Sequence, residues 1–558
     1  MNQNPDLILV HPPSVYDFRR RDDLIFPHIF NTAVKVSPML EMFPLGFYNI
    51  KSYLEVHHIN VEICNLAKIM LDHWELDVKD LLMKLKPRIF GIGFHWLAHA
   101  NGALEICKVI KDVHKDVPIL LGGISASYFY KELIKYPFVD FIIRGNIPFQ
   151  PLELLIKHLI EKDSEYSKIP NLCYKKNGKV YINPDKFYSE KSFFPVNWGI
   201  KELKDKNINF VTIIPTLGCN RNCCFCSASR YSTKRYALQN KVFLCRPGKK
   251  ILTELNSFKV FWKSPLKKRK LDLSIPGYWH EDRKLRSIVL NKIKKLGLFS
   301  VLHIETFELM PMKIIKDITK YVNPIIEISP ESHDFKIRKL CQRAVYTNRE
   351  FEGWAEKVLE LNVKRLEVYF MIGLPGQTAE SINDTVKYCE FLLGKFKRKK
   401  NLIPFINAMI PFLNPASAAF EHPQKYGYRL FYKTAREHAN ALTEISLKNR
   451  LNYETKWLSR EQILNVTYRF GRRLTLAKMR HGYLSSGLGK AIISRLDETF
   501  QLKGALDKID LIKDSKRRSG ALQNIAKRIR IYNKEIMTGK FCDQLPIDLS
   551  LYNFWYEI

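Results

Sequence analysis

The sequence predicts an α/β protein with a Rossmann-like, doubly wound parallel sheet, then a full or partial TIM-type (β/α) barrel, then a mostly helical C-terminal region. The first observation is that short apolar runs alternate with amphipathic segments over residues 6–162 and again over 207–400. The second is that these runs are continuously apolar, which is typical of strands covered by helices on both faces. The chain has 558 residues, 46% of them hydrophobic, which is enough for about two to four domains with buried cores.

Residues 1–165 are expected to form the first domain. Its predicted elements, in order, are the strand LILVHPP, the helix GFYNIKSYLEVH, the strand NVEICNLA, the helix LDVKDLLMKLK, the strand RIFGIGFHW, the helix GALEICKVIKDVH, the strands PILLGGISAS and VDFIIRGN, and the helix PLELLIKHLIEK. Ligands of such sheets bind at the carboxyl ends of the strands. That rule points to residues 11–13, 95–99 and 122–127.

Residues 166–206 are predicted to be a hairpin and a polar linker, because Asn177-Gly178 in NLCYKKNGKVYIN is typical of a tight hairpin turn. Residues 207–400 are expected to form the barrel. Its strands are NFVTIIPT, LDLSIPG, SVLHIET, PIIEISPES and RLEVYFMIGLPG, each followed by a loop and a helical stretch. Residues 401–558 are mostly helical in pattern, as in RLFYKTAREHANALTEIS.

The formal net charge of +34 favours anionic partners such as nucleic acid, lipid surfaces or phosphorylated substrates. We prefer the plainer explanation of a lysine-rich solvated surface. The densest basic runs, at 263–270, 395–400 and 513–534, are not interleaved with aromatic residues as a single-strand platform would be, so nucleic-acid binding is not expected.

Two features of the sequence bear on location. No run of about 18 uncharged apolar residues is present, so no membrane-spanning helix is expected. The start MNQNPDLILVHPP lacks the regions of a signal peptide. We therefore expect a cytoplasmic protein, in which clustered cysteines more often bind metal than form disulfides.

Four of the eleven cysteines fall within IPTLGCNRNCCFCSASRY. Cys219, Cys223 and Cys226 form C-x3-C-x2-C, and three thiolates on a short loop can hold three irons of a 4Fe-4S cluster and leave the fourth iron open. A structural zinc site requires four ligands, which usually come as two separated pairs. Cys224 is the candidate for the fourth ligand. A C-x-x-C redox motif is the remaining alternative. We favour the open-iron cluster because no second pair lies nearby.

The motif resembles the signature of the radical S-adenosylmethionine (SAM) superfamily, C-x3-C-x-Φ-C, with Phe225 at the aromatic position. The resemblance implies that the open iron binds the amino and carboxylate groups of SAM and that Cys224, at a variable position, is not a ligand. It also implies a SAM site formed by later strand ends, with Arg343 downstream. The positions that match are Gly277, Glu331, Ser332, Gly373 and Gly376.

Residues 6–400 together resemble the cobalamin-binding radical SAM proteins, which place a Rossmann-like domain before the barrel. That resemblance implies a corrin site formed by His95, Gly122, Gly123, Ser125 and Ser127. The D-x-H-x-x-G motif that supplies an axial histidine in some cobalamin proteins is absent, and Asn146 stands where a glutamate is common. Methylthiotransferases carry a second cluster on three N-terminal cysteines, but Cys64, Cys107 and Cys173 do not suggest one site.

Three functional hypotheses follow. The first is a radical SAM enzyme, with a C-methyltransferase as the expected type. Here the resemblance implies that reductive SAM cleavage gives a 5′-deoxyadenosyl radical. This radical removes a hydrogen atom from an unactivated carbon, and the resulting substrate radical takes a methyl group from methylcobalamin. The second is ring formation or carbon–carbon coupling without methyl transfer. The third is a non-catalytic basic protein with a structural zinc.

The partners expected from the first hypothesis are a small-molecule or lipid-like substrate and an electron donor such as ferredoxin or flavodoxin. Contact with a membrane surface stays open.

Overall fold

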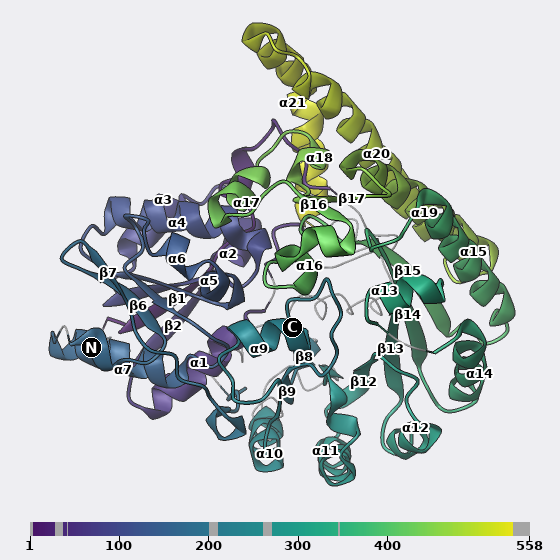
Figure 1. Cartoon of the computed structure of the whole chain (residues 1–558), viewed down its shortest axis with the longest axis horizontal. Coiled ribbons are helices and arrows are strands. Elements are labelled where there is room, and N and C mark those ends of the chain that lie inside the picture. Colours follow the sequence, from purple (N-terminus) through teal and green to yellow (C-terminus); the bar gives the residue numbers. More distant parts are fainter. Residues whose placement is uncertain are drawn as a thin grey trace.

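The computed structural model describes residues 4–27, 37–41, 43–163, 165–199, 210–259, 271–343 and 346–538. Two sheets lie side by side, a seven-stranded one on the left of Figure 1 and a six-stranded one on the right. Helices α19, α20 and α21 run along the upper right of the molecule. The basic run at 263–270 lies outside the described residues.

The first sheet begins with five parallel strands in the order β2-β1-β3-β4-β5. Helices cover both faces: Leu54 of α1 (Leu45–Val56) packs with α7 (Phe149–Glu161) on one face, and α4 (Ala100–Val113) packs on the other. This is the predicted Rossmann-like, doubly wound arrangement. The strands are β1 (Leu7–His11), β2 (Val61–Asn65), β3 (Ile89–Gly93), β4 (Ile119–Gly122) and β5 (Phe141–Ile143).

A β-hairpin extends this sheet. Strands β6 (Leu172–Lys176) and β7 (Lys179–Ile182) are antiparallel, and β6 pairs with β5. Asn177 and Gly178 both have positive φ, 51° and 74°, as a two-residue turn between twisted strands requires. The predicted hairpin is therefore present, and it completes the first sheet.

The second sheet is wholly parallel, and its six strands follow the chain in the order β8-β11-β12-β13-β14-β15. Within the described residues β8 and β15 are its two edges, so the ladder forms an open sheet and no closed barrel. The strands are β8 (Phe210–Thr212), β11 (Leu271–Ser274), β12 (Phe299–Thr306), β13 (Pro324–Glu331), β14 (Arg365–Ile372) and β15 (Leu402–Ala408).

The C-terminal region is mostly helical, as expected, but it opens with β15. Helix α19 (Arg460–Arg480) packs on α15 (Ala379–Lys395) and on β15. Helices α20 (Ser486–Asp510) and α21 (Ser515–Thr538) continue from it. No helix in the described ranges has the length and apolar character needed to cross a membrane.

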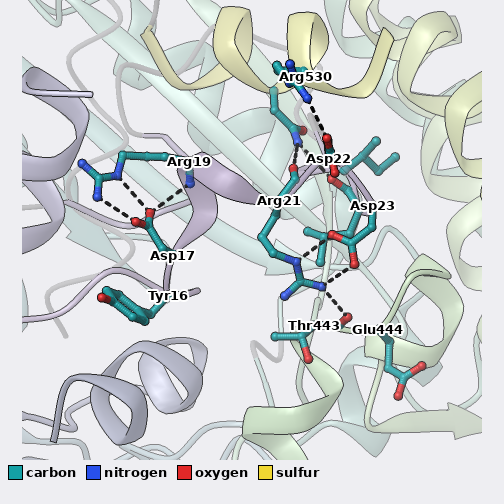
Figure 2. Close-up of polar contacts among 12 residues, drawn as sticks. Tyr16, Asp17, Arg19, Arg21, Asp22, Asp23, Thr443, Glu444 and Arg530 are labelled. Carbon is teal, nitrogen blue, oxygen red and sulfur yellow. Dashed lines mark hydrogen bonds and ion pairs between the residues drawn. The ribbon is translucent and has the colours of Figure 1, made fainter. Parts of the chain in front are cut away.

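Polar contacts tie the far end of α21 back to the segment before α1 (Figure 2). Arg530 forms an ion pair with Asp22 at 2.7 Å. Arg21 donates to Asp23 and to the carbonyl oxygen of Thr443. Asn533 accepts a hydrogen bond from the amide of residue 26 and donates to the carbonyl oxygens of residues 21 and 24. Residues 21–26 near the N-terminus are thereby joined to the last helix of the described chain.

Candidate functional site

One cavity of about 870 Å³ lies between the two sheets. Its walls come from the carboxyl ends of β1, β3 and β4 on one side and from loops at the carboxyl ends of the second sheet on the other. Ligand sites of parallel α/β sheets lie at this end of the strands. Both halves of the predicted site therefore open into the same space.

The cysteine loop forms one wall of the cavity. Cys219, Cys223 and Cys226 line it, between β9 (Thr216–Gly218) and α9 (Arg230–Tyr236). Each sulfur accepts a hydrogen bond: the amide of residue 221 donates to Cys219 at 3.3 Å, the amide of residue 228 to Cys226 at 3.3 Å, and the Arg343 side chain to Cys223 at 3.2 Å. Such donors stabilise thiolate sulfur.

Burial opposes ionisation of two of these thiols, Cys219 and Cys226. It raises the pKa of Cys219, and it raises the pKa of Cys226 to about 12. A bound cation would favour the thiolate and reverse this effect. Within the described residues, no group of three or more His, Cys, Asp or Glu side chains is set to hold a single metal ion. The three sulfurs on one wall fit a cluster with one iron left open.

Cys224 points away from the cavity. It is fully buried and is absent from the cavity lining. Its amide donates to the carbonyl oxygen of Cys341 at 3.1 Å, and its carbonyl oxygen accepts from the amide of Ala419 at 2.8 Å. The next residue, Phe225, returns to the cavity wall.

A buried charged group lies beside the cysteines. Arg343 pairs with Glu331 at 3.0 Å, donates to the carbonyl oxygen of Ser329 at 3.0 Å, and stacks over the ring of Phe307 at 4.1 Å. Burial raises the pKa of Glu331 and of Glu305 to about 7, against the lowering effect of Arg343. Both carboxyl groups can therefore exchange a proton near neutral pH.

Glu331 adopts a backbone conformation that side chains rarely take. Its φ is +68°, and the register of β13 against β14 shifts between Ile328 and Glu331. Irregular strands and left-handed non-glycine residues are concentrated at functional sites. The strand end turns the Glu331 side chain toward the cavity, whose wall includes it.

The remaining predicted SAM positions divide into two groups. Gly277 lines the cavity, and a Cβ there would lie 2.4 Å from the Thr216 hydroxyl. Ser332, Gly373 and Gly376 do not line it. A Cβ would lie 2.2 Å from the Tyr453 hydroxyl at Gly373 and 3.0 Å from Leu340 at Gly376. The structure thus gives the glycines of the GLPG loop a packing role.

On the other wall, four of the five predicted corrin positions line the cavity: His95, Gly122, Gly123 and Ser125. Ser127 does not. Its hydroxyl donates to the carbonyl oxygen of Gly123 at 2.9 Å and accepts from the amide of Gly145 at 2.9 Å. Ser127 therefore holds together the turns after β4 and β5.

Three imidazoles reach this wall. Burial lowers the pKa of His11 and of His95 to about 4 and lowers that of His99 well below its usual value, so all three are neutral at pH 7. His11 and His99 both contact the carbonyl oxygen of Leu40 through Nε2, at 2.8 and 3.3 Å. The His95 side chain lines the cavity, so it is accessible although protein surrounds it on its other sides.

Sequence reasoning missed two features of the wall. Glu305, at the end of β12, lines the cavity together with Glu331. Its signal was present in the sequence, as an acidic residue next to the end of the apolar strand SVLHIET. Arg246 and Glu254 form a buried ion pair that also lines the cavity. They come from different elements, and no spacing rule connects them.

The comparisons with known proteins bear first on the N-terminal half. Residues 31–148 match the family model of the B12 binding domain. The chain contains a B12-binding domain. The strand ends that line the cavity from β1, β3 and β4 belong to this domain.

Two curated relatives match longer stretches. An uncharacterized methyltransferase of Pyrococcus horikoshii is 28% identical over 203 residues, 35% of this chain and 42% of that protein. The match thus spans less than half of that relative's length. An uncharacterized protein of Methanocaldococcus jannaschii is 24% identical over 357 residues, 62% of this chain and 72% of that protein.

Solved structures show the same fold beyond the B12-binding domain. The radical SAM methyltransferase TsrM of Kitasatospora setae, solved with cobalamin and a 4Fe-4S cluster, aligns with a TM-score of 0.58 at 13% identity, over 90% of this chain and 100% of that one. The cobalamin-dependent SAM radical enzyme OxsB, solved with aqua-cobalamin, aligns with a TM-score of 0.55 at 12% identity, over 97% and 80%. Over most of its length the chain thus shares the fold of these two proteins.

Proposed function

We propose that this chain is a cobalamin-dependent radical SAM enzyme that transfers a methyl group to an unactivated carbon. The observation that carries the proposal is the shared cavity, whose walls bring together the strand ends of the B12-binding domain and the three-cysteine loop. A methyl donor held on one wall and a radical source on the other would both reach a substrate between them.

The residues of the cysteine wall suit an iron–sulfur cluster and SAM. Cys219, Cys223 and Cys226 would hold the cluster, and their N–H donors would stabilise its sulfur ligands. Glu305 and Glu331 would face the ammonium group of SAM, because both are buried in the cavity wall at strand ends of the second sheet, whereas the buried Glu254 is paired with Arg246. When bound, the cluster, SAM and the corrin supply one-electron chemistry and an activated methyl group.

The chain itself positions these groups and excludes water. Arg343 connects the two sides of the cysteine wall, since it contacts the Cys223 sulfur and the Glu331 carboxylate together. Its stacking on Phe307 and its burial keep the guanidinium in one orientation. A cation that enters beside the carboxyl pair would lower both pKa values from about 7, and the pair would then release a proton at neutral pH. An electron donor such as ferredoxin or flavodoxin would supply the electron, and a small or lipid-like substrate would enter the space.

The test is an anaerobic purification with iron, sulfide and hydroxocobalamin supplied, followed by metal, sulfide and corrin assays. We expect about four irons, as in a cubane cluster, and one corrin per chain, with 5′-deoxyadenosine formed from SAM under reduction. A product heavier by one methyl group would support the proposal, whereas loss of hydrogens alone would favour ring formation. Zinc without iron or sulfide would overturn it.

A further inference from the structure

The geometry points to His95 as a nitrogen ligand of cobalt, an inference that rests on the proposed use of cobalamin. His95 stands two residues beyond the end of β3, within the wall that the B12-binding domain gives to the cavity. Imidazole nitrogen is a common protein ligand of transition metals. The chain lacks the D-x-H-x-x-G motif, so that motif cannot supply the nitrogen, whereas His95 lies at a strand end of the cavity wall.

Of the three imidazoles on this wall, the His95 ring is the one whose nitrogens are available to bind a metal. Its ring nitrogens have no hydrogen-bond partner among the residues that the structure describes, and the ring lies against Trp96 with centroids 5.8 Å apart. His11 and His99 are already engaged in other contacts. Each contacts the Leu40 carbonyl oxygen through Nε2, and their rings pack edge to face with centroids 4.9 Å apart.

The backbone of His95 is held rigidly, as a metal ligand requires. Its carbonyl oxygen accepts two hydrogen bonds from Ser125, from the amide at 3.1 Å and from the hydroxyl at 2.9 Å. Gly123 packs directly on it, since a Cβ at that glycine would lie 2.4 Å from the His95 Cα. The turn after β4 therefore fixes the loop after β3 and leaves the His95 side chain open to the cavity. This explains why Gly123 and Ser125 stand at those positions.

The experiment uses the full chain loaded anaerobically with cobalamin and reduced to the cob(II)alamin state. Its electron paramagnetic resonance spectrum reports the nucleus bonded along the cobalt axis. With natural histidine we expect a nitrogen triplet, and in protein made with ¹⁵N-histidine we expect that triplet to become a doublet. His95→Ala should lose the histidine splitting while still holding corrin, and added imidazole should restore a triplet.

The unsubstituted protein gives a decision even if the variant folds poorly. A triplet unchanged by ¹⁵N-histidine would identify the cofactor's own benzimidazole as the ligand and overturn the inference, as would bound corrin without nitrogen splitting. Failure to bind any corrin would instead contradict the proposed function. His158→Ala is the matched control, because His158 lies on α7 of the same domain and is not part of the cavity lining, so its spectrum should match that of the unsubstituted chain.

Discussion

At the scale of single residues, the four crowded cysteines separate by direction. Cys219, Cys223 and Cys226 line the cavity, while Cys224 is fully buried and is not part of the lining. Cys224→Ala should leave iron and sulfide per chain nearly unchanged after anaerobic reconstitution, at a stability cost of about 1–2 kcal/mol for the lost buried volume. Alanine at any of the other three should abolish both the cluster and SAM cleavage.

Cys341→Ala is the matched control for that series, because Cys341 is a buried thiol beside Cys224 that also lies off the cavity. It should behave as Cys224→Ala does. Iron loss in Cys224→Ala without iron loss in Cys341→Ala would mean that Cys224 is a ligand, and the three-cysteine assignment would be wrong.

The two adjacent glycines at the end of β4, Gly122 and Gly123, should respond very differently to a methyl group. Gly123 has φ +114°, and a Cβ would press on the backbone of His95, whereas nothing lies within 4 Å of a Cβ at Gly122. Gly123→Ala should lower the free energy of unfolding by at least about 1–3 kcal/mol and reduce the corrin retained on gel filtration. Gly122→Ala should change the free energy of unfolding by less than about 0.5 kcal/mol. Equal effects in urea unfolding would show that the close contact with His95 is not what restricts position 123.

At the scale of elements, the contribution of the contacts between α21 and residues 21–26 to the free energy of unfolding can be measured. Asn533 is buried and makes three hydrogen bonds to the backbone of that segment. Asn533→Ala should cost about 1–3 kcal/mol, because it leaves buried backbone groups without partners. Arg530→Ala should cost less than about 1 kcal/mol, since Arg530 and Asp22 are 69% and 42% exposed. Urea unfolding compares them, and a larger loss for Arg530→Ala would contradict the role given to Asn533.

The sequence predicted elements best where local pattern decides the structure. Continuous apolar runs located β1, β3 and β4, and Asn177-Gly178 located the hairpin, because strand burial and turn geometry depend on a few neighbouring residues. Strand β15 was missed. Its run LIPFINA contains a proline and is only partly buried, so it resembles a loop until the pairing with β14 is known.

The candidate site was predictable to the extent that it is contiguous in sequence. The cysteine motif identified three wall residues directly, and strand-end reasoning placed His95 and Gly123 at the cavity. Residues that only tertiary packing brings together, such as the Arg246–Glu254 pair, could not be predicted from the sequence. The close packing of Gly373 could not be predicted for the same reason, because it is made with Tyr453, 80 residues away, and no local pattern contains that contact.

At the scale of the whole molecule, the shared cavity makes the two sheets parts of one binding unit. A ligand that contacts both walls stabilises both, by about 2.7 kcal/mol when present at a hundred times its dissociation constant. Hydroxocobalamin should therefore slow amide hydrogen exchange in peptides covering residues 91–101 and 119–128 of the B12-binding domain and also in the cysteine loop, 216–229. Peptides of the β6–β7 hairpin, which is absent from the cavity lining, should exchange at the same rate with and without corrin. Protection confined to the B12-binding domain would show that the corrin does not contact the cysteine wall, and the cavity would then be two sites and not one.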